Sequence, residues 1–222
     1  MIHNSYEITP AYFNSWSQKI KRKRMMLLGF SQYLVDVPQM LCPVLKGSLG
    51  HHFDENSKMV NCPCGFTTDT SEKIFVEYTD FNEVQMKQGI QALILNFLRY
   101  FKPSEYKVSV YDYIHYNADV LGPLYVFSTG KNGFIDIIPT DEKSLKQKVA
   151  MIAQYYRKVE SKIGTQSVYD FNKSCKPEER IPLRILIINR GQENFDLLQE
   201  PEMSYVLNNA KKYGITTLCL VK

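Results

Sequence analysis

A polar pair directly follows the most apolar run of this sequence. Residues 185–188 are four consecutive aliphatic side chains, which is typical of a strand buried on both faces of a sheet. Asn189 and Arg190 come next. In open α/β sheets, ligands bind just beyond the carboxyl ends of the strands. Nucleotide-hydrolysing motors place acidic residues there to hold Mg²⁺ and to orient water. An amide and a cation at this place therefore argue against nucleotide hydrolysis.

Cysteines and histidines between residues 42 and 64 could in principle bind zinc. Structural zinc sites favour cysteine pairs with two to four intervening residues. Here the last two cysteines are separated by one residue, and the two histidines are adjacent. These residues are therefore expected to be loop cysteines and surface histidines that bind no metal. The zinc site is kept only as a weak alternative. Its members are Cys42, His51, His52, Cys62 and Cys64.

A basic run ends a helix that is expected from Pro10 to Lys23, with Thr9 as its cap. Cations near a helix C-terminus interact favourably with the helix dipole, so a solvated helix end is the simpler interpretation. The alternative is a contact with nucleic acid, acidic lipid or an acidic partner. The cations of the run are Lys19, Lys21, Arg22, Lys23 and Arg24.

Several other side chains could do chemistry, but their spacing does not single them out. Tyr111, Tyr113, Tyr155 and Tyr156 could stack on the bases of a single strand. At strand or helix spacing, core or interface positions are favoured for them. Asp112 ends a predicted strand, where it lies near a ligand crevice or caps a turn. No particular Cys–His pair is marked as a nucleophile and its base.

Composition indicates a protein that folds without disulfides. The chain has 222 residues, a net charge of +4 and five irregularly spaced cysteines, which suits a reducing compartment. No apolar run approaches the roughly 20 residues that span a bilayer, and the N-terminus lacks the order of a signal peptide. We expect a cytoplasmic domain, with recruitment to a membrane complex through another chain left open.

Alternating strands and helices must position the polar pair. Residues 1–45 are expected to form an irregular N-terminal extension, and residues 46–222 one α/β domain. Strands alternating with helices indicate a mainly parallel sheet with helices on both faces. The predicted strands are residues 73–79, 107–113, 124–128, 133–139, 184–190 and 216–221. The predicted helices are residues 83–101, 141–163, 167–172 and 201–213.

These stretches resemble the motor domain of FtsK/SpoIIIE-type P-loop ATPases. The family comprises hexameric DNA translocases, with relatives in conjugation and type VII secretion. The resemblance covers residues 38–222 and rests on the order and spacing of its stretches, with no diagnostic motif intact. It implies a P-loop-NTPase-like (RecA-like) fold that lacks the family's portion beyond Val221, as in a truncated or split domain. The similar stretches are residues 90–113, 134–158, 167–172, 181–192 and 211–221.

The segment at the place of the family's phosphate loop is Asp80 to Lys87. A working loop needs glycines so that backbone N–H groups converge on the phosphates, a lysine, and a hydroxyl for Mg²⁺. This segment has no glycine, and Asp80 and Glu83 would repel a triphosphate. Lys87 lies about where the hydroxyl residue belongs. Shifting the alignment by one residue could place Lys87 at the lysine position of the family's loop, but it could not supply the missing glycines.

The family's acidic pair is also replaced. Asn189 and Arg190 stand at its place, and Gln192 is a third vestigial position. A cation there would oppose Mg²⁺. The resemblance thus implies a degenerate, non-hydrolysing domain with a structural or regulatory role in a DNA- or protein-translocating assembly. No cofactor is expected.

Two alternatives stay open. The first is an active ATP-dependent DNA translocase that uses ATP and Mg²⁺ through an atypical loop. The second is a nucleic-acid-binding module that acts through the basic run at residues 19–24. The expected partners are related ATPase domains, in a homo- or hetero-oligomer, with DNA or a secreted protein as substrate. A direct membrane span is not expected.

Overall fold

The structure is a computed structural model that describes residues 25–34, 39–67, 71, 73–112, 120–128, 133–190 and 196–221. It divides into two compact units, Met1–Thr68 and Asp69–Lys222. The helix predicted at residues 10–23 and the basic run at residues 19–24 lie outside the described residues.

The first unit contains a three-stranded antiparallel sheet of order β1-β3-β2. Its long strands, β1 and β3, pair with a register irregularity between Leu27 and Gly29. The sequence does not predict the strand at residues 25–34, because apolar and polar side chains do not alternate there as they do in a half-buried strand. The elements are β1 (Met25–Leu34), η1 (Gln39–Leu41), α2 (Cys42–Leu49), η2 (Gly50–His52), β2 (Phe53–Asp54) and β3 (Met59–Thr67).

The second unit contains a five-stranded sheet of order β4-β8-β7-β5-β6, in which every described pair is parallel. The strands are β4 (Lys73–Glu77), β5 (Tyr106–Asp112), β6 (Ile135–Ile137), β7 (Leu183–Arg190) and β8 (Ile215–Val221). The predicted parallel sheet is therefore confirmed.

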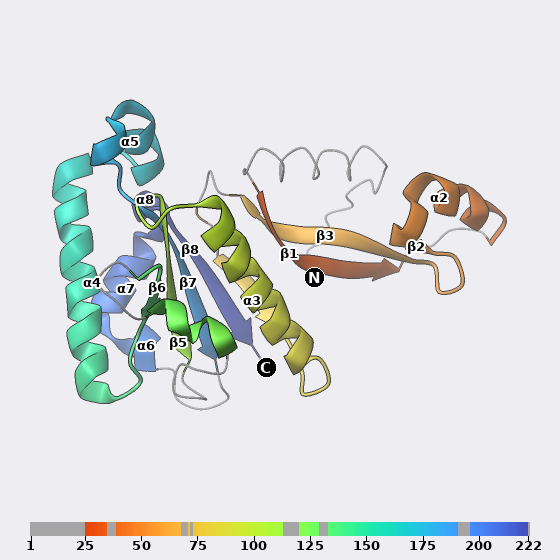
Figure 1. Cartoon of the computed structure of the whole chain (residues 1–222), viewed down its shortest axis with the longest axis horizontal. Coiled ribbons are helices and arrows are strands. Elements are labelled where there is room, and N and C mark those ends of the chain that lie inside the picture. The colour runs from red at the N-terminus through yellow and green to blue at the C-terminus, as the bar shows by residue number, and fades with distance from the viewer. Residues whose placement is uncertain are drawn as a thin grey trace. The chain divides into compact units, whose positions relative to one another are not determined.

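Helices cover both faces of this sheet, with α3 (Glu83–Tyr100) on one side and α4 (Glu142–Ile163) and α7 (Pro201–Asn208) on the other (Figure 1). Each long helix buries a stripe at spacings of three and four, as the sequence pattern predicts. The remaining elements are η3 (Gly122–Ser128), α5 (Val168–Ser174), η4 (Pro177–Glu179), α6 (Asp196–Gln199) and α8 (Ala210–Tyr213). On α3 the stripe is Ile90, Leu93, Ile94 and Phe97.

Three local predictions need correction. Residues 124–128 form part of the 3₁₀ helix η3 and not a strand, because Gly122, at φ 51°, turns the chain into it. A short apolar run cannot by itself distinguish the two structures. The helix predicted from residue 141 begins at Glu142, because Asp141 is its N-cap and accepts a hydrogen bond from the Ser144 N–H. The helix predicted at residues 201–213 breaks at Asn209 into α7 and α8.

The parallel arrangement brings several chain segments to one edge. Because β4, β5, β7 and β8 run in the same direction, their carboxyl ends meet there. The backbone N–H of Tyr78 donates to the carbonyl of Val221 at 2.8 Å, which extends the β4–β8 ladder by one step. This edge is where the sequence pattern predicts a ligand.

Candidate functional site

A buried chain of three polar side chains lies at the carboxyl edge of the sheet. The Oη of Tyr78 donates to Oδ1 of Asn189 at 3.1 Å. The Nδ2 of Asn189 donates to Oδ1 of Asp112 at 3.0 Å. The three residues are 4%, 1% and 0% exposed, respectively. These two hydrogen bonds therefore connect the ends of β4, β7 and β5, and all three side chains are buried.

Strand register brings these residues together. Asp112 of β5 is the register partner of Asn189 of β7, so both side chains stand on the same face of the sheet. The neighbouring Tyr111 and Ile188 point to the opposite face, into the core formed with α4 and α7. Asp112 and Asn189 thus lie on the face that α3 covers.

The second oxygen of Asp112 is also bonded. Its Oδ2 accepts from the backbone N–H of Val120 at 3.0 Å. The carbonyl of Val120 in turn accepts from Nε2 of Gln91, on α3, at 3.3 Å. Asp112 therefore both anchors the segment that follows β5 and holds Asn189 in place. A buried carboxyl group with neutral donors on both oxygens is suited to fixing structure.

The turn from β4 to α3 makes its own hydrogen bonds. Oδ1 of Asn82 accepts from the backbone N–H of Thr79 at 2.7 Å and from its hydroxyl at 3.3 Å. The backbone N–H of Asn82 donates to the Thr79 carbonyl at 3.1 Å. This arrangement is the local side-chain-to-backbone bonding that Asn favours in turns. The Thr79 amide is therefore already engaged.

The segment at the place of a phosphate loop is mostly helical. Asp80 lies exposed in the turn, whereas Glu83 and Lys87 lie on the first turns of α3. The Nζ of Lys87 and Oε1 of Glu83 form an ion pair of 2.7 Å, at the i, i+4 spacing. The cation thus faces a carboxylate of its own helix.

These residues do not fit a magnesium-bound triphosphate. A phosphate cradle needs several backbone N–H groups aimed at one point. The turn at residues 78–82 contains no glycine, and its Thr79 N–H bonds Asn82. Both ends of the Asn189 amide are occupied, by Tyr78 and by Asp112. The amide is therefore not presented to an ion or to a water molecule at this edge.

Several other predicted site residues lie partly or wholly outside the described part of the structure. The side chain of Arg190 and all of Gln192 lie outside the described residues, as do the side chains of Cys62 and Cys64. Cys42 is buried, and its Sγ contacts Oε1 of Gln39 at 3.8 Å. Within the described part of the chain, no three His, Cys, Asp or Glu side chains are grouped as metal ligands.

The candidate stacking tyrosines are mostly core residues. Tyr111 and Tyr156 are fully buried, and Tyr156 stacks on Tyr213 with ring centroids 4.8 Å apart. Tyr155 is 37% exposed and meets Tyr156 edge to face. Tyr113 lies outside the described residues. The described tyrosines therefore form no shared exposed platform.

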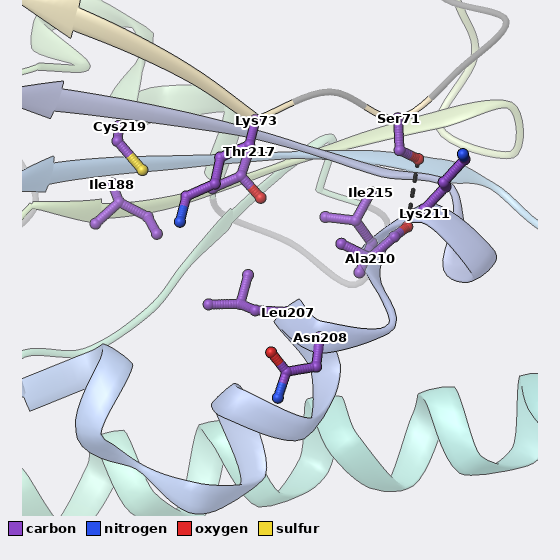
Figure 2. Close-up of a pocket in the computed structure, with 10 residues that line it drawn as sticks. All are labelled: Ser71, Lys73, Ile188, Leu207, Asn208, Ala210, Lys211, Ile215, Thr217 and Cys219. Carbon is purple, nitrogen blue, oxygen red and sulfur yellow. Dashed lines mark hydrogen bonds between the residues drawn. The ribbon is translucent and has the colours of Figure 1, made fainter.

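A cavity of about 280 Å³ lies on the opposite face of the sheet, beside β4. Figure 2 shows strand residues on one side of the cavity and residues of α7 and α8 on the other. Ser71 lies at one end, where its hydroxyl donates to the carbonyl of Ala210 at 3.3 Å. Apolar side chains and two lysines, Lys73 and Lys211, line the cavity. Its lining residues include Lys73, Ile188, Leu207, Lys211, Thr217 and Cys219.

Sequence reasoning missed two residues near the carboxyl edge of the sheet, Tyr78 and Asn82. Tyr78 is one of fifteen tyrosines, and nothing in its neighbourhood marks it. Asn82 could have been found, because an Asn directly before a helical pattern is a cap or turn signal.

No protein-family profile and no curated protein sequence matches this chain. The solved structures that are similar to it include two of EssC. The first is the cytoplasmic domain of EssC, with a TM-score of 0.52 and 14% identity, over 90% of this chain and 33% of that one. The second is EssC (ATPases 2 and 3) from Geobacillus thermodenitrificans, with a TM-score of 0.49 and 15% identity, over 75% of this chain and 31% of that one.

This chain thus spans about a third of the length of each of these two structures. At such low identity the similarity shows the fold alone. This conclusion rests on the first structure, which has the TM-score above 0.5. The predicted α/β, P-loop-NTPase-like fold is confirmed. Among the described residues, no helix has the length and apolar character needed to cross a bilayer.

Proposed function

We propose that this chain is a non-hydrolysing ATPase-fold module with a structural or regulatory role in a translocating assembly of the FtsK/SpoIIIE or type VII secretion kind. The fold it shares with the cytoplasmic domain of EssC supports the class. The similar sequence stretches, such as residues 181–192, also support it. The module contributes surfaces to the assembly, and related domains that hydrolyse ATP supply the energy.

The observation that carries the proposal is the buried chain Tyr78–Asn189–Asp112. A motor needs its charged groups at this edge exposed to nucleotide, metal and water. Here the equivalent edge holds an amide bonded on both sides and removed from solvent. The same residues connect three strands, so they contribute to folding.

The β4–α3 turn supports the proposal separately. Its Thr79 amide is bonded to Asn82, and Lys87, on the helix that follows, is paired with Glu83. Supplying an acidic residue at position 189 would not remedy either feature. We therefore expect that restoring acids after β7 does not restore turnover.

The test is a titration of the purified chain with a fluorescent ATP analogue, with and without Mg²⁺, together with a phosphate-release assay. We expect no saturable binding below about 1 mM, which corresponds to less than roughly 4 kcal/mol of binding free energy. The double variant Asn189→Asp/Arg190→Glu should remain inactive. Micromolar, Mg²⁺-dependent binding by the unmodified chain would reject the proposal and favour the active-translocase alternative.

The assembly role needs its own measurement. Crosslinking in the source cells, followed by mass spectrometry, should join this chain to a protein that has an intact phosphate loop and acidic pair. Crosslinks only to proteins without such motifs would contradict the role. The nucleotide result would stand in either case.

A further inference from the structure

We propose that strand β4 is a self-complementary edge through which two copies of this chain pair antiparallel about a two-fold axis. β4 is an outer strand of the five-stranded sheet, with β8 on its inner side. In the described part of the chain, no strand pairs with its other side. This inference does not depend on whether the protein binds nucleotide.

The backbone groups that such pairing needs point the right way. The Tyr78 N–H bonds Val221, so Tyr78 directs its peptide groups toward β8. Successive residues of a strand direct their N–H and C=O groups to alternate edges. Lys73, Phe75 and Glu77 therefore direct theirs to the outer edge, where they form a template for another strand.

The side chains of the same three residues are exposed. Phe75, at the centre of β4, is 57% exposed, which is high for an aromatic ring in a strand. Lys73 and Glu77 flank it at equal distances along the strand, and both are exposed. The Nζ of Lys73 lies 5.3 Å from the centre of the Phe75 ring. An apolar centre thus lies between one positive and one negative end.

An antiparallel pair centred on Phe75 uses all of these groups. Phe75 then lies opposite Phe75 of the second copy, and Lys73 lies opposite the second copy's Glu77, twice by symmetry. Directly opposed residues share a face and have the closest side chains, so both charge pairs are attractive. Ile74 lies opposite the second copy's Val76, which extends the apolar contact on the other face.

Charge also excludes the competing arrangement. A parallel, in-register pair would place Lys73 beside Lys73 and Glu77 beside Glu77, which is repulsive. Edge strands that avoid pairing commonly carry charge that repels any copy. Opposite charges at symmetric positions instead favour a second copy of this chain in the antiparallel orientation, as an isologous two-fold contact requires.

The test is sedimentation velocity of the full chain over a range of concentrations. We expect a reversible monomer–dimer equilibrium that weakens with added salt. Lys73→Glu and Glu77→Lys should each weaken dimerisation by roughly tenfold or more, since each replaces two attractive pairs by two repulsive ones. Lys143→Glu, an exposed charge reversal on α4, should have no effect.

Mixing the two single variants provides the decisive readout. In Lys73→Glu both ends of β4 are acidic, and in Glu77→Lys both are basic. The mixture should therefore form heterodimers at concentrations at which each variant alone is mostly monomeric. The double variant should dimerise like the original chain. Formation of the heterodimer also shows that both variants are folded. A chain that stays monomeric, because its own segments or another protein occupy the edge, would overturn the proposal. A dimer indifferent to these reversals would do so as well.

Discussion

The Nδ2 atom of Asn189 lies 3.0 Å from Oδ1 of Asp112, so an amide stands beside a buried carboxyl group at the carboxyl edge of the sheet. An amide can donate to that oxygen, whereas a second carboxylate could not. The identity of residue 189 is therefore constrained by Asp112 as well as by Tyr78, which donates to the amide oxygen. Folding alone gives a reason for an asparagine at this position.

The first prediction concerns Asn189→Asp, which would place two carboxyl groups in contact inside the protein. We expect a loss of roughly 2–4 kcal/mol in the free energy of unfolding near neutral pH. Protonation of the pair relieves the repulsion, so the loss should be smaller at about pH 4 than at about pH 8. Urea unfolding at both pH values measures it.

A matched control keeps one acid and one amide but exchanges them. In the double variant Asn189→Asp/Asp112→Asn, the new amide can still donate across the pair, and Tyr78 can still donate to residue 189. We expect part of the lost stability to return and its pH dependence to weaken. An equal loss in the single and double variants would show that packing, and not charge, explains the effect.

The second prediction is that Tyr78→Phe destabilises the protein by about 1–2 kcal/mol, because the buried Asn189 oxygen loses its donor. Tyr125→Phe is a suitable control, since Tyr125 is 46% exposed on η3, and it should change stability by less than about 0.5 kcal/mol. Thermal and urea unfolding of both variants give the comparison. Equal effects would contradict a structural role for the Tyr78 hydroxyl.

The sequence predicts the strands and helices around this site better than it predicts the contacts between the site's side chains. The aliphatic run at residues 185–188 and the periodic stripes of α3 and α4 indicate strands and helices, because each pattern buries a face. Contact between Asp112 and Asn189, 77 positions apart, depends on the β5–β7 register. A one-residue slip would turn one side chain to the opposite face, and no local pattern fixes that register.

The third prediction concerns the side chain that closes the β4–α3 turn. Asn82→Ala removes the acceptor of the Thr79 N–H and hydroxyl, and should cost about 0.5–1.5 kcal/mol. Asn82→Asp keeps the acceptor and adds a negative charge next to the N-terminus of α3, which the helix dipole favours. It should lie within about 0.5 kcal/mol of the original chain. Urea unfolding separates the two variants, and an equally destabilised Asp variant would contradict this role.

The fourth prediction follows from Glu160, which connects α4 to the last helices. Its carboxylate accepts from Lys212 Nζ at 2.6 Å, from Tyr205 Oη at 2.8 Å and from Tyr213 Oη at 3.1 Å. These hydrogen bonds lower the pKa of Glu160 from 4.5 to about 2. The depressed pKa means that the folded state binds this proton less readily than the unfolded state does.

The stability that Glu160 contributes should therefore be fully present above about pH 4.5 and lost as the pH falls toward 2. Glu160→Gln should be less stable than the original chain at pH 7, and its stability should fall less steeply across this window. Glu142→Gln serves as the control, because hydrogen bonding to Lys146 also lowers the pKa of Glu142 but on an exposed surface, where solvent screens the pair. Urea unfolding at steps between pH 2 and pH 7 measures all three slopes. A Glu160→Gln slope equal to that of the original chain, or a larger change in Glu142→Gln, would show that this cluster does not link α4 to α7 and α8 energetically.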